Sequence, residues 1–443
     1  MSTDRIVVGV DVGTTKFCTL VGEISGSNRL RIIGVGIEPA QGMHKGTVVD
    51  VALATEAVRA SKRTAERTSG YEISRAYVSI AGKHIASMNS KGLTGMNSNR
   101  GVVTADEIDR ALQAARAVNL PHGREIIHVI PRTFTLDGQE GIRNPLGLHA
   151  FRLEVEAHII TAATSSLRNL EKCVNDAGLA VDRFVLNQLA SGEVALTDAE
   201  RESGVAVIDI GGGTTDVAVF IDGTVWHSCV IEVGGNHITS DIAHVLHVPA
   251  SEAERIKVDD GNANPDDVDP DMLITVQPFG EQQSMQILAH DVARIIEARV
   301  DEIFTLVMQE LKRSGYDSLL PAGVVVTGGT AALKNIAVNA SKVMNLPARV
   351  GRPEDITGLV DRLQNPAYST SVGLLRFANR VIDMPSKDRD ARVRKSGGFK
   401  ITIPKLSRPK GQKSDGPNIG KAVGNILGRL LPEDEENDGN PTG

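Results

Sequence analysis

Two segments about 200 residues apart repeat one design, and this repeat constrains the fold more than any other feature of the chain. The segments are VGVDVGTTKF at 8–17 and VIDIGGGTTDVAVF at 207–220. Each consists of an apolar run that ends near an aspartate, a glycine turn, paired threonines and a second apolar run. Apolar runs on both sides of a glycine turn predict a β-hairpin. Two copies predict two similar lobes, each of which contributes one hairpin to a shared cleft.

The residues of both turns suit the binding of phosphate groups. Glycine lets a backbone approach an anion without hindrance from a Cβ atom, which favours Gly13 and Gly211–Gly213 as close neighbours of a ligand. Consecutive N–H groups in such turns form a nest for phosphate oxygens, and the threonine hydroxyls with the Lys16 ammonium group add donors. One such turn would equally fit an ordinary glycine hairpin. Further glycine pairs at Gly234–Gly235 and Gly328–Gly329 make a nucleotide site the favoured interpretation.

The two aspartates beside the glycine turns form a candidate metal site. If the hairpins face one another, Asp11 and Asp209 can hold a hydrated Mg²⁺, because Mg²⁺ favours a few carboxylates, retained waters and substrate phosphate. The alternative is that each aspartate caps its own turn, as short carboxylate side chains often do. The residues alone leave both interpretations open.

The composition narrows the class of protein. Of the 443 residues, 41% are hydrophobic and 23% are charged, as in an ordinary globular chain. A net charge of −7 and an aromatic content of 3% argue against a nucleic-acid binder, which needs a basic surface or stacking platforms. Cys18, Cys173 and Cys229 share no metal-like spacing, and the histidines show no paired motif, so we expect buried thiols and no zinc site. Because neither a secretory signal nor a spanning apolar run is present, we expect a cytoplasmic location.

The order of strand-like and helix-like segments predicts a two-lobed body with an insertion. A mixed pattern at 83–160, with a helix capped by Thr104, is typical of a small α+β subdomain. The most periodic segment, 284–315, predicts one long helix. The expected order is first lobe at 1–82, inserted subdomain at 83–160, first lobe again at 161–190, second lobe at 191–345, and a return to the first lobe at 346–382.

The composition changes near residue 383. Residues 383–416 are basic and rich in Pro, Gly and Ser, which favours a flexible linker, and residues 432–443 form an acidic end. Between them, 417–431 predict an amphipathic helix with an apolar face made of Ile419, Val423, Ile426, Leu427, Leu430 and Leu431. Such a face can lie in the interface of an anionic membrane. Three glycines in this segment and the acidic end weaken membrane binding by a single helix. We therefore expect stable membrane binding only when many copies of the tail bind together. The alternative is a helix that docks on the protein's own body or on a partner.

The motifs, taken in order, resemble those of known ATPases. DVGTTK, DIGGGTTD and VVVTGGT are similar to the phosphate and adenosine motifs of the actin and heat-shock-chaperone superfamily. Within it the chain resembles the FtsA family of bacterial cell-division proteins, through HKGTVVD at 44–50, VSIAGKHI at 78–85, HVIPRTFTLDGQEGIRNPLG at 128–147 and LTDAERESGVAVIDIGGGTTD at 196–216. The resemblance implies an α/β, actin-like two-lobed ATPase fold with a family-specific subdomain inserted in the first lobe and a flexible tail that ends in an amphipathic helix.

The resemblance also implies roles for individual residues. The phosphates of ATP, bound with Mg²⁺, would contact Gly13, Thr14, Thr15 and Lys16 from one lobe and Gly211, Gly212, Gly213 and Thr214 from the other. Ribose and base would lie among Gly234, Gly235, Glu254 and Lys257, with Gly328, Gly329 and Thr330 on the adenine side. Arg299 and Glu302 would meet the C-terminal tail of FtsZ. From the pattern alone, Glu254 with Lys257 is equally a surface ion pair, and Arg299 with Glu302 a solvated helix face.

The implied function is that of an ATP-binding scaffold which polymerises, anchors the FtsZ ring to the inner membrane and helps to recruit other division proteins. Hydrolysis needs a group that positions or deprotonates water. Asn187, in LNQLAS, stands where filament-forming relatives carry Glu or Gln, so we expect slow turnover at most. The alternatives are a pilus-assembly actin-like ATPase and a small-molecule kinase of the same fold. The tail argues against the first, and the absence of an obvious acceptor site argues against the second.

Overall fold

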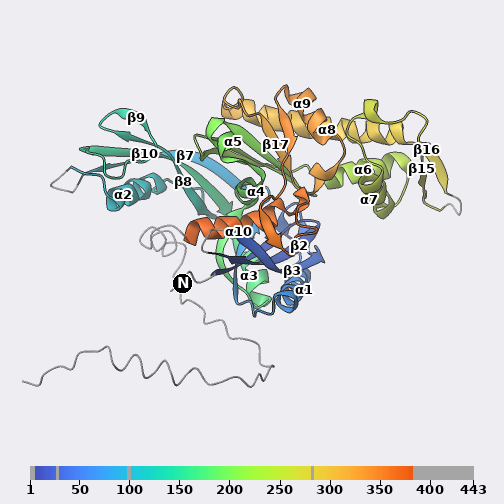
Figure 1. Ribbon diagram of the computed structural model, residues 1–443, viewed down its shortest axis with the longest axis horizontal. Helices are drawn as coiled ribbons and strands as arrows, with labels where there is room; N and C mark the ends of the chain where they lie inside the picture. The colour runs from blue at the N-terminus through green and yellow to red at the C-terminus, as the bar shows by residue number, and fades with distance from the viewer. Residues whose placement is uncertain (1–4, 26–28, 97–100, 281–283, 383–443) are drawn as a thin grey trace, which may run out of the picture. The chain divides into compact units, whose positions relative to one another are not determined.

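The computed structural model describes residues 5–25, 29–96, 101–280 and 284–382, all within one compact unit (Figure 1). The predicted linker at 383–416, the amphipathic helix at 417–431 and the acidic end at 432–443 lie outside the described residues. Within the described ranges, every helix is too short or too polar to span a membrane.

The first lobe is built on a six-stranded sheet in the order β11-β6-β1-β2-β3-β19. Its strands are β1 (Arg5–Val12), β2 (Lys16–Ile24), β3 (Leu30–Pro39), β6 (Arg75–Ile80), β11 (Ala180–Leu186) and β19 (Ile356–Gly358). Side chains of a strand alternate between the faces of a sheet. Phe17 of β2 therefore packs toward α1 (Val51–Ser69) and α3 (Thr164–Asp176), whereas Cys18 packs toward α10 (Ser369–Ile382). Because helices cover both faces, apolar side chains predominate in the central strands.

The second lobe repeats this arrangement in a five-stranded sheet with the order β14-β13-β12-β17-β18. Its strands are β12 (Val205–Ile210), β13 (Thr215–Ile221), β14 (Thr224–Ile231), β17 (Val324–Thr327) and β18 (Ala348–Val350). In both sheets an antiparallel hairpin has parallel strands on one side and a third antiparallel strand on the other. The five strands β11-β6-β1-β2-β3 thus match β18-β17-β12-β13-β14 in order and direction. The prediction of two similar lobes is confirmed.

Helices cover both faces of the second sheet. The helices of this lobe are α4 (Asn187–Ala195), α5 (Asp198–Ser203), α6 (Gly235–Leu246), α7 (Ala250–Asp259), α8 (Ala289–Ser314) and α9 (Ile336–Met344). Apolar side chains of α6, α7, α8 and α9 form one core with Ile208 and Val326. On the other face, Leu189 of α4 joins the core around Val207. The β12-β13 hairpin is therefore held between two apolar layers.

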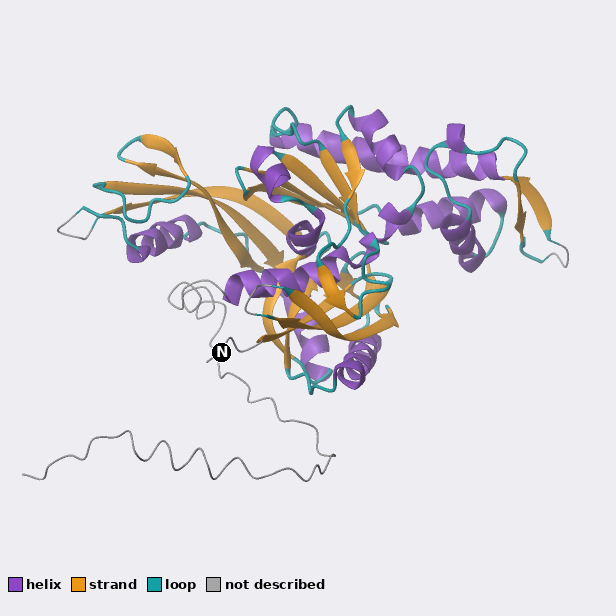
Figure 2. Ribbon diagram, in the orientation of Figure 1, coloured by secondary structure: helices purple, strands orange, loops and turns teal. Residues whose placement is uncertain are grey.

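The inserted subdomain is an antiparallel sheet with one helix packed against it (Figure 2). Its elements are β7 (Ile85–Gly95), α2 (Ala105–Arg116), β8 (Arg124–Leu136), β9 (Gln139–Ile142) and β10 (Arg152–Ala163). Thr104 caps α2 as expected, because its N–H donates to Glu107 Oε2 over 3.0 Å. The subdomain contacts the second lobe through strand β14, where the hydroxyl of Ser87 donates to the carbonyl of Ser228 over 2.7 Å.

Short elements complete the described chain and revise two expected boundaries. They are β4 (Met43–His44), β5 (Thr47–Val48), β15 (Leu273–Val276), β16 (Met285–Leu288) and the 3₁₀ turns Pro265–Asp267, Gly329–Ala332 and Pro366–Tyr368. The long helix predicted from residue 284 begins at Ala289, because Met285–Leu288 pair with β15 instead. The chain rejoins the first sheet only at β19, since β18 still extends the second sheet beyond the expected boundary at 345.

Candidate nucleotide site

The first glycine loop closes the β1-β2 hairpin. The Gly13 N–H donates to the carbonyl of Lys16 over 3.1 Å, and a Cβ atom on Gly13 would lie 2.7 Å from that oxygen. The side chain of Lys16 leaves the hairpin, donates to the carbonyl of Ala367 over 2.6 Å and lies 4.6 Å from the centre of the Tyr368 ring. The hydroxyl of Thr14 accepts the Gly46 N–H over 3.2 Å. The backbone of the first loop is therefore fixed by a hydrogen bond of its own, and its side chains bond residues outside the hairpin.

The second glycine loop meets the first one directly. A Cβ atom on Gly212 would lie 2.4 Å from Thr15 Cγ2, and one on Gly213 would lie 3.0 Å from both Thr14 Oγ1 and Lys45 Cα. Contacts this short are not available to a larger residue without movement of a neighbour. The structure thus brings together the two turns that the sequence analysis placed in one cleft.

The third and fourth glycine turns pack against the back of the second loop. The carbonyl of Gly211 accepts the N–H of Gly235 over 2.8 Å and the hydroxyl of Thr330 over 3.2 Å. A Cβ atom on Gly234 would lie 2.6 Å from the same carbonyl. Gly328, with φ of 89°, has backbone dihedrals that a side chain disfavours. All four predicted glycine turns therefore form one continuous structure.

The two predicted metal aspartates are joined through the start of α10. Asp11 accepts hydrogen bonds from the hydroxyls of Ser79 (2.9 Å) and Ser371 (2.7 Å), and Asp209 accepts one from Thr370 (2.8 Å). Both carboxylates are buried. Burial raises the pKa of Asp209, while the Thr370 hydroxyl acts in the opposite direction. Under the alternative interpretation, each aspartate would cap its own glycine turn. Their observed hydroxyl partners lie instead in distant segments of the chain, which argues against that alternative.

A third buried carboxylate, Asp216 of β13, belongs to the same site and was missed in the sequence analysis. Its Oδ1 atom has no hydrogen-bond partner, and neither do Asn187 Oδ1 and Ser191 Oγ. Burial, followed by repulsion from Asp209, raises its pKa well above the ordinary value. Two signals were available in the sequence: Asp216 ends the DIGGGTTD motif, and an aspartate in a largely apolar strand needs a partner for its charge.

These acidic groups fit a hydrated divalent cation. The buried carboxyl groups of Asp11, Asp209 and Asp216 repel one another, and Asp216 Oδ1 has no hydrogen-bond partner. Among the described residues, none of these three carboxyl groups forms an ion pair with a lysine, arginine or histidine. Carboxylate oxygens with retained water are the ligands that Mg²⁺ favours. Thr214, whose hydroxyl donates to Asp216 Oδ2 over 3.4 Å, links the cluster to the second glycine loop.

Asn187 lies at the first turn of α4, beside this cluster. Its side-chain N–H donates to Asp216 Oδ2 over 3.5 Å, while its carbonyl oxygen is unpartnered. An amide can orient a water molecule but cannot take a proton from it. At the position of Asn187, the described structure therefore offers no side chain that could deprotonate an attacking water molecule.

Glu254 and Lys257 form the i, i+3 ion pair of the alternative interpretation, but only the glutamate is exposed, over 47% of its side chain. Lys257 is buried, and its ammonium group donates to Glu254 Oε2 (2.6 Å), the Thr239 hydroxyl (2.9 Å) and the carbonyl of Gly235 (3.3 Å). This pair is thereby fastened to the third glycine turn. The helix α7 thus contributes a cation to the side of the site assigned to the ribose and base.

Arg299 and Glu302 lie together on α8, and Arg299 is fixed by a third residue. Its guanidinium donates to both oxygens of Asp241 on α6, over 2.6 Å and 2.9 Å, and also pairs with Glu302. Bidentate pairing of this kind orients an arginine firmly. Because α6 begins at Gly235, one helix links the third glycine turn to Arg299.

Two lysines near the phosphate loops were also missed. Lys45, between β4 and β5, and Lys83, after β6, each lie 4.0 Å from the carboxylate of Glu232 at the end of β14. They belong to turns of the first lobe, whereas Glu232 follows the second sheet. No short motif marks this ion pair, because it depends on contact between distant segments.

Comparison with known proteins agrees with the resemblance seen in the motifs. The family model described as "Cell division protein FtsA" matches residues 206–373, and that described as "SHS2 domain inserted in FTSA" matches residues 82–161. The cell division protein FtsA of Pseudomonas aeruginosa is 40% identical over 373 residues, which cover 84% of this chain and 89% of the relative. That of Escherichia coli K12 is 38% identical, with 85% and 91% covered, and that of Bacillus subtilis 37% identical, with 86% and 85% covered.

Solved structures show the same fold at much lower identity. The PilM-PilN type IV pilus biogenesis complex aligns with a TM-score of 0.60 at 15% identity, over 84% of this chain and 98% of that one. MreB 5 of Spiroplasma citri bound to AMPPNP aligns with a TM-score of 0.52 at 16% identity, over 86% and 98%. Likeness at this level shows an actin-like fold and no more, so the pilus-assembly alternative is weaker than the relationship given by 37–40% identity. The chain belongs to the FtsA family of cell division proteins.

Proposed function

We propose that this protein binds ATP with Mg²⁺ between its two glycine loops and serves as a nucleotide-controlled scaffold of cell division. The observation that carries the proposal is the direct meeting of the loops, in which Gly212 leaves no room for a Cβ atom beside Thr15. The threonines of the first loop thus lie beside the glycines of the second. A ligand that engages both loops at once would favour the closed arrangement of the lobes.

The proposal assigns a role to each part of the site. Thr14, Thr15, Lys16 and the N–H groups of Gly211–Gly213 with Thr214 would hold the phosphates. Asp11 and Asp209 would hold Mg²⁺ through water, and the bound ion would neutralise phosphate charge. The ribose and adenine would lie among Gly234, Gly235, Glu254, Lys257, Gly328, Gly329 and Thr330.

Nucleotide would act mainly as a structural switch. Asn187 occupies the place of a water-activating residue and cannot accept a proton. Turnover is therefore expected to be slow, so that bound ATP persists long enough to control assembly. A single-turnover experiment in which ATP is cleaved within seconds would contradict this part of the proposal.

Partner binding would be coupled to the site through α6. This helix begins at Gly235 in the nucleotide site and carries Asp241, which orients Arg299. Arg299 and Glu302 would then present a fixed pair of opposite charges to the C-terminal tail of FtsZ. A shift of α6 on nucleotide binding would change that presentation.

Membrane attachment would come from the tail. The apolar face at 419–431 would lie in the anionic inner membrane on its cytoplasmic side, at the division site. Polymerisation of this protein would place many weak anchors in one assembly, which raises the overall avidity. Other division proteins would join the same assembly, and nucleic acid would have no part in it.

One reconstitution tests the proposal. The full-length protein is mixed with FtsZ and anionic liposomes, with and without ATP and Mg²⁺, and the pelleted proteins are measured. We expect Lys16→Met to lose ATP dependence, Arg299→Ala to lose FtsZ alone, and deletion of 417–443 to lose liposome binding. Lys342→Met and Arg294→Ala, at exposed positions on α9 and α8, are the matched controls. Failure to recruit FtsZ under any nucleotide condition would overturn the proposal.

A further inference from the structure

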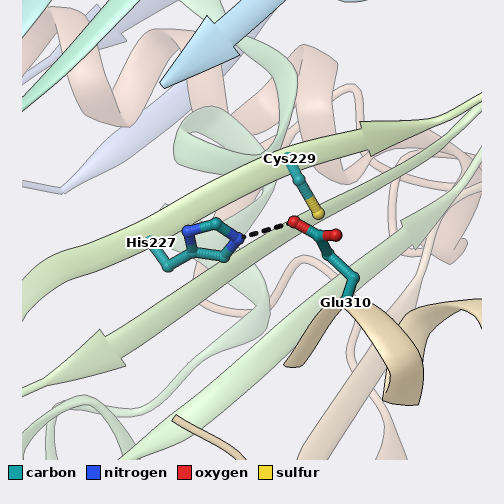
Figure 3. Close-up of side chains that lie close together, drawn as sticks. All are labelled: His227, Cys229 and Glu310. Carbon is teal, nitrogen blue, oxygen red and sulfur yellow. Dashed lines mark hydrogen bonds and ion pairs between the residues drawn. The ribbon is translucent and has the colours of Figure 1, made fainter. Parts of the chain in front are cut away.

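Three side chains with metal-binding atoms converge between strand β14 and helix α8, outside the nucleotide site (Figure 3). His227 and Cys229 come from the strand and Glu310 from the helix. One donor atom from each lies within 4.8 Å of the others, and His227 Nε2 is 3.1 Å from Glu310 Oε1. In Figure 3 the imidazole and the thiol both point toward the carboxylate.

The backbone places these three groups together. Residues two apart on a strand share a face, so His227 and Cys229 project to the same side of β14. Ser228 projects to the opposite side, where its hydroxyl bonds His158. Pairing of β14 with β13 fixes the strand, and Glu310 lies on α8 between the buried residues Val307 and Leu311. The three donors are therefore preorganised by secondary structure rather than by a mobile loop.

The donor set indicates the class of metal. A thiolate, an imidazole and a carboxylate together suit a borderline-soft ion such as Zn²⁺, whereas Mg²⁺ and Ca²⁺ favour oxygen ligands alone. In a tetrahedral zinc site the nitrogen and oxygen ligands are roughly 3.3 Å apart, which is close to the observed separation of His227 and Glu310. A fourth position would remain for water.

The surroundings allow a small ion to enter. The side chains of His227 and Glu310 are 14% and 17% exposed, so the site is shielded but not sealed. In the metal-free protein Nε2 of His227 carries the proton that it donates to Glu310, so Zn²⁺ would bind the neutral tautomer that is protonated on Nδ1 instead. Zinc would replace the thiol proton of Cys229, so that one S–H bond breaks, one Zn–S bond forms and one proton is released.

One charged group competes for the same position. Arg313, one turn along α8, donates to Glu310 Oε2 over 2.7 Å and also to Oε1. Its side chain is 72% exposed, so the guanidinium can move into solvent at little cost. In the metal-free protein this cation neutralises the carboxylate, and its departure would accompany zinc binding.

We propose that His227, Cys229 and Glu310 form a zinc site that fastens β14 to α8. Strand β14 is the edge of the second sheet and bonds the inserted subdomain through Ser228. A bound ion would therefore stiffen the joint between the second lobe and that subdomain. The expectation of no zinc site rested on the absence of paired histidine and cysteine motifs, and a His-x-Cys pair completed by a distant glutamate contains no such motif.

The first test uses Co²⁺ as a spectroscopic probe on the untagged full-length protein. We expect an absorption band from charge transfer between thiolate and Co²⁺ that disappears on addition of Zn²⁺. Cys229→Ser should abolish the band, whereas Cys18→Ala and Cys173→Ala, at the other two cysteines, should retain it. A band that survives Cys229→Ser, or is absent from the wild-type protein in excess Co²⁺, overturns the proposal.

The second test measures Zn²⁺ affinity by competition with a chromophoric chelator. His227→Gln and Glu310→Gln should each weaken binding by about tenfold or more, within the range seen when ligand shells are disturbed. Arg313→Gln should tighten binding several-fold, because it releases the carboxylate, and the neighbouring Lys312→Gln should not change it. Circular dichroism of each variant verifies that it is folded. Equal affinity in wild type, His227→Gln and Arg313→Gln would contradict the proposal.

Discussion

The two glycine loops share one sequence design, yet the structure holds them in different ways. Both loops are closed by their own hairpins, through the bond from Gly13 to Lys16 in the first and from Gly211 to Thr214 in the second. The lysine of the first loop reaches the carbonyl of Ala367. The second loop is enclosed by other segments, because Gly212 abuts Thr15 and the carbonyl of Gly211 accepts two bonds from elsewhere. The side chains of the first loop bond Gly46 and Ala367, whereas in the second loop one backbone carbonyl, that of Gly211, bonds two further glycine turns.

The two loops therefore contribute different properties to the site. The first loop contributes the cation, Lys16, whose ammonium group bonds the carbonyl of Ala367 and lies over the Tyr368 ring. The second loop contributes the backbone framework on which three other glycine turns rest. Changes of shape should therefore be costly around the second loop, and changes of charge should matter most in the first.

The largest effect is expected for added bulk behind the second loop. In Gly328→Ala the new Cβ atom would lie 2.4 Å from Asp209 Oδ1 and 2.6 Å from the carbonyl of Ile210, at a φ of 89°. Strain and overpacking together should lower the free energy of unfolding by about 3 kcal/mol or more. The measurement is urea denaturation of the nucleotide-free protein.

The adjacent glycine supplies the control for this substitution. In Gly329→Ala the nearest atom would be the Ala367 Cβ, 3.9 Å away, so the change in unfolding free energy should stay within about 1 kcal/mol. Equal losses of stability in the two variants would show that the second loop is not a tightly packed framework.

The next effect tests charge in the first loop. Lys16→Met keeps the aliphatic stem but removes the ammonium group that would reach a phosphate. Hydrogen bonds to charged groups contribute about 1.5–3 kcal/mol, so ATP should bind roughly 10- to 100-fold more weakly. The unfolding midpoint should fall less than in Gly328→Ala, because the loss is limited to the bond to Ala367 and the contact with Tyr368. Calorimetric titration with ATP measures the first quantity, and Lys342→Met at an exposed position is the control. Unchanged ATP affinity in Lys16→Met would break the proposed division between the loops.

A smaller effect is expected from the carboxylate behind the second loop. Burial raises the pKa of Asp216 in the folded protein. The unfolded chain then ionises first as the pH rises above about 4, so this group makes the folded state less stable with increasing pH until its folded pKa is reached. Asp216→Asn should stabilise the nucleotide-free protein at pH 8 by roughly 1 kcal/mol, with a smaller gain at pH 5.

The same variant should bind Mg²⁺–ATP less tightly, because the unpartnered Oδ1 oxygen is lost. Urea denaturation at the two pH values gives the stability, and titration with and without Mg²⁺ gives the affinity. The exposed Asp271→Asn is the control. A stability difference that does not depend on pH would rule out ionisation of Asp216 as its cause.

Local signals in the sequence were sufficient for much of the fold. Thr104 with Glu107 marks the start of α2, and the glycine turns with apolar flanks mark both hairpins. Local signals could not predict which distant residue forms a hydrogen bond with each buried polar group. Ser371 bonds Asp11 from 360 residues away, and the start of α10 holds both aspartates for that reason.

The same limit explains the errors. Residues 285–288 have helical periodicity, but pairing with β15 makes them a strand, and no single segment contains that information. Asp216 was overlooked because its importance comes from Asp209 and Asn187 packed beside it rather than from its neighbours in the chain. Prediction therefore succeeded where residues close in the sequence determine the local structure. It failed where contacts between distant segments determine that structure.

The smallest effect is expected where the lobes are joined only by exposed charges. Glu232 lies 4.0 Å from both Lys45 and Lys83, and all three side chains are at least one-third exposed to solvent. Exposed ion pairs contribute about 0.2–1 kcal/mol and are screened by salt. If this carboxylate helps to hold the loops together, Glu232→Gln should weaken ATP binding by no more than about fivefold at low salt. The effect should vanish at high salt, whereas that of Lys16→Met should persist, because a lysine that bonds Ala367 and would also contact a bound phosphate is less accessible to salt ions. A salt-independent loss in Glu232→Gln that exceeds the loss in Lys16→Met would mean that closure of the lobes rests on charge as much as on the packed glycine framework.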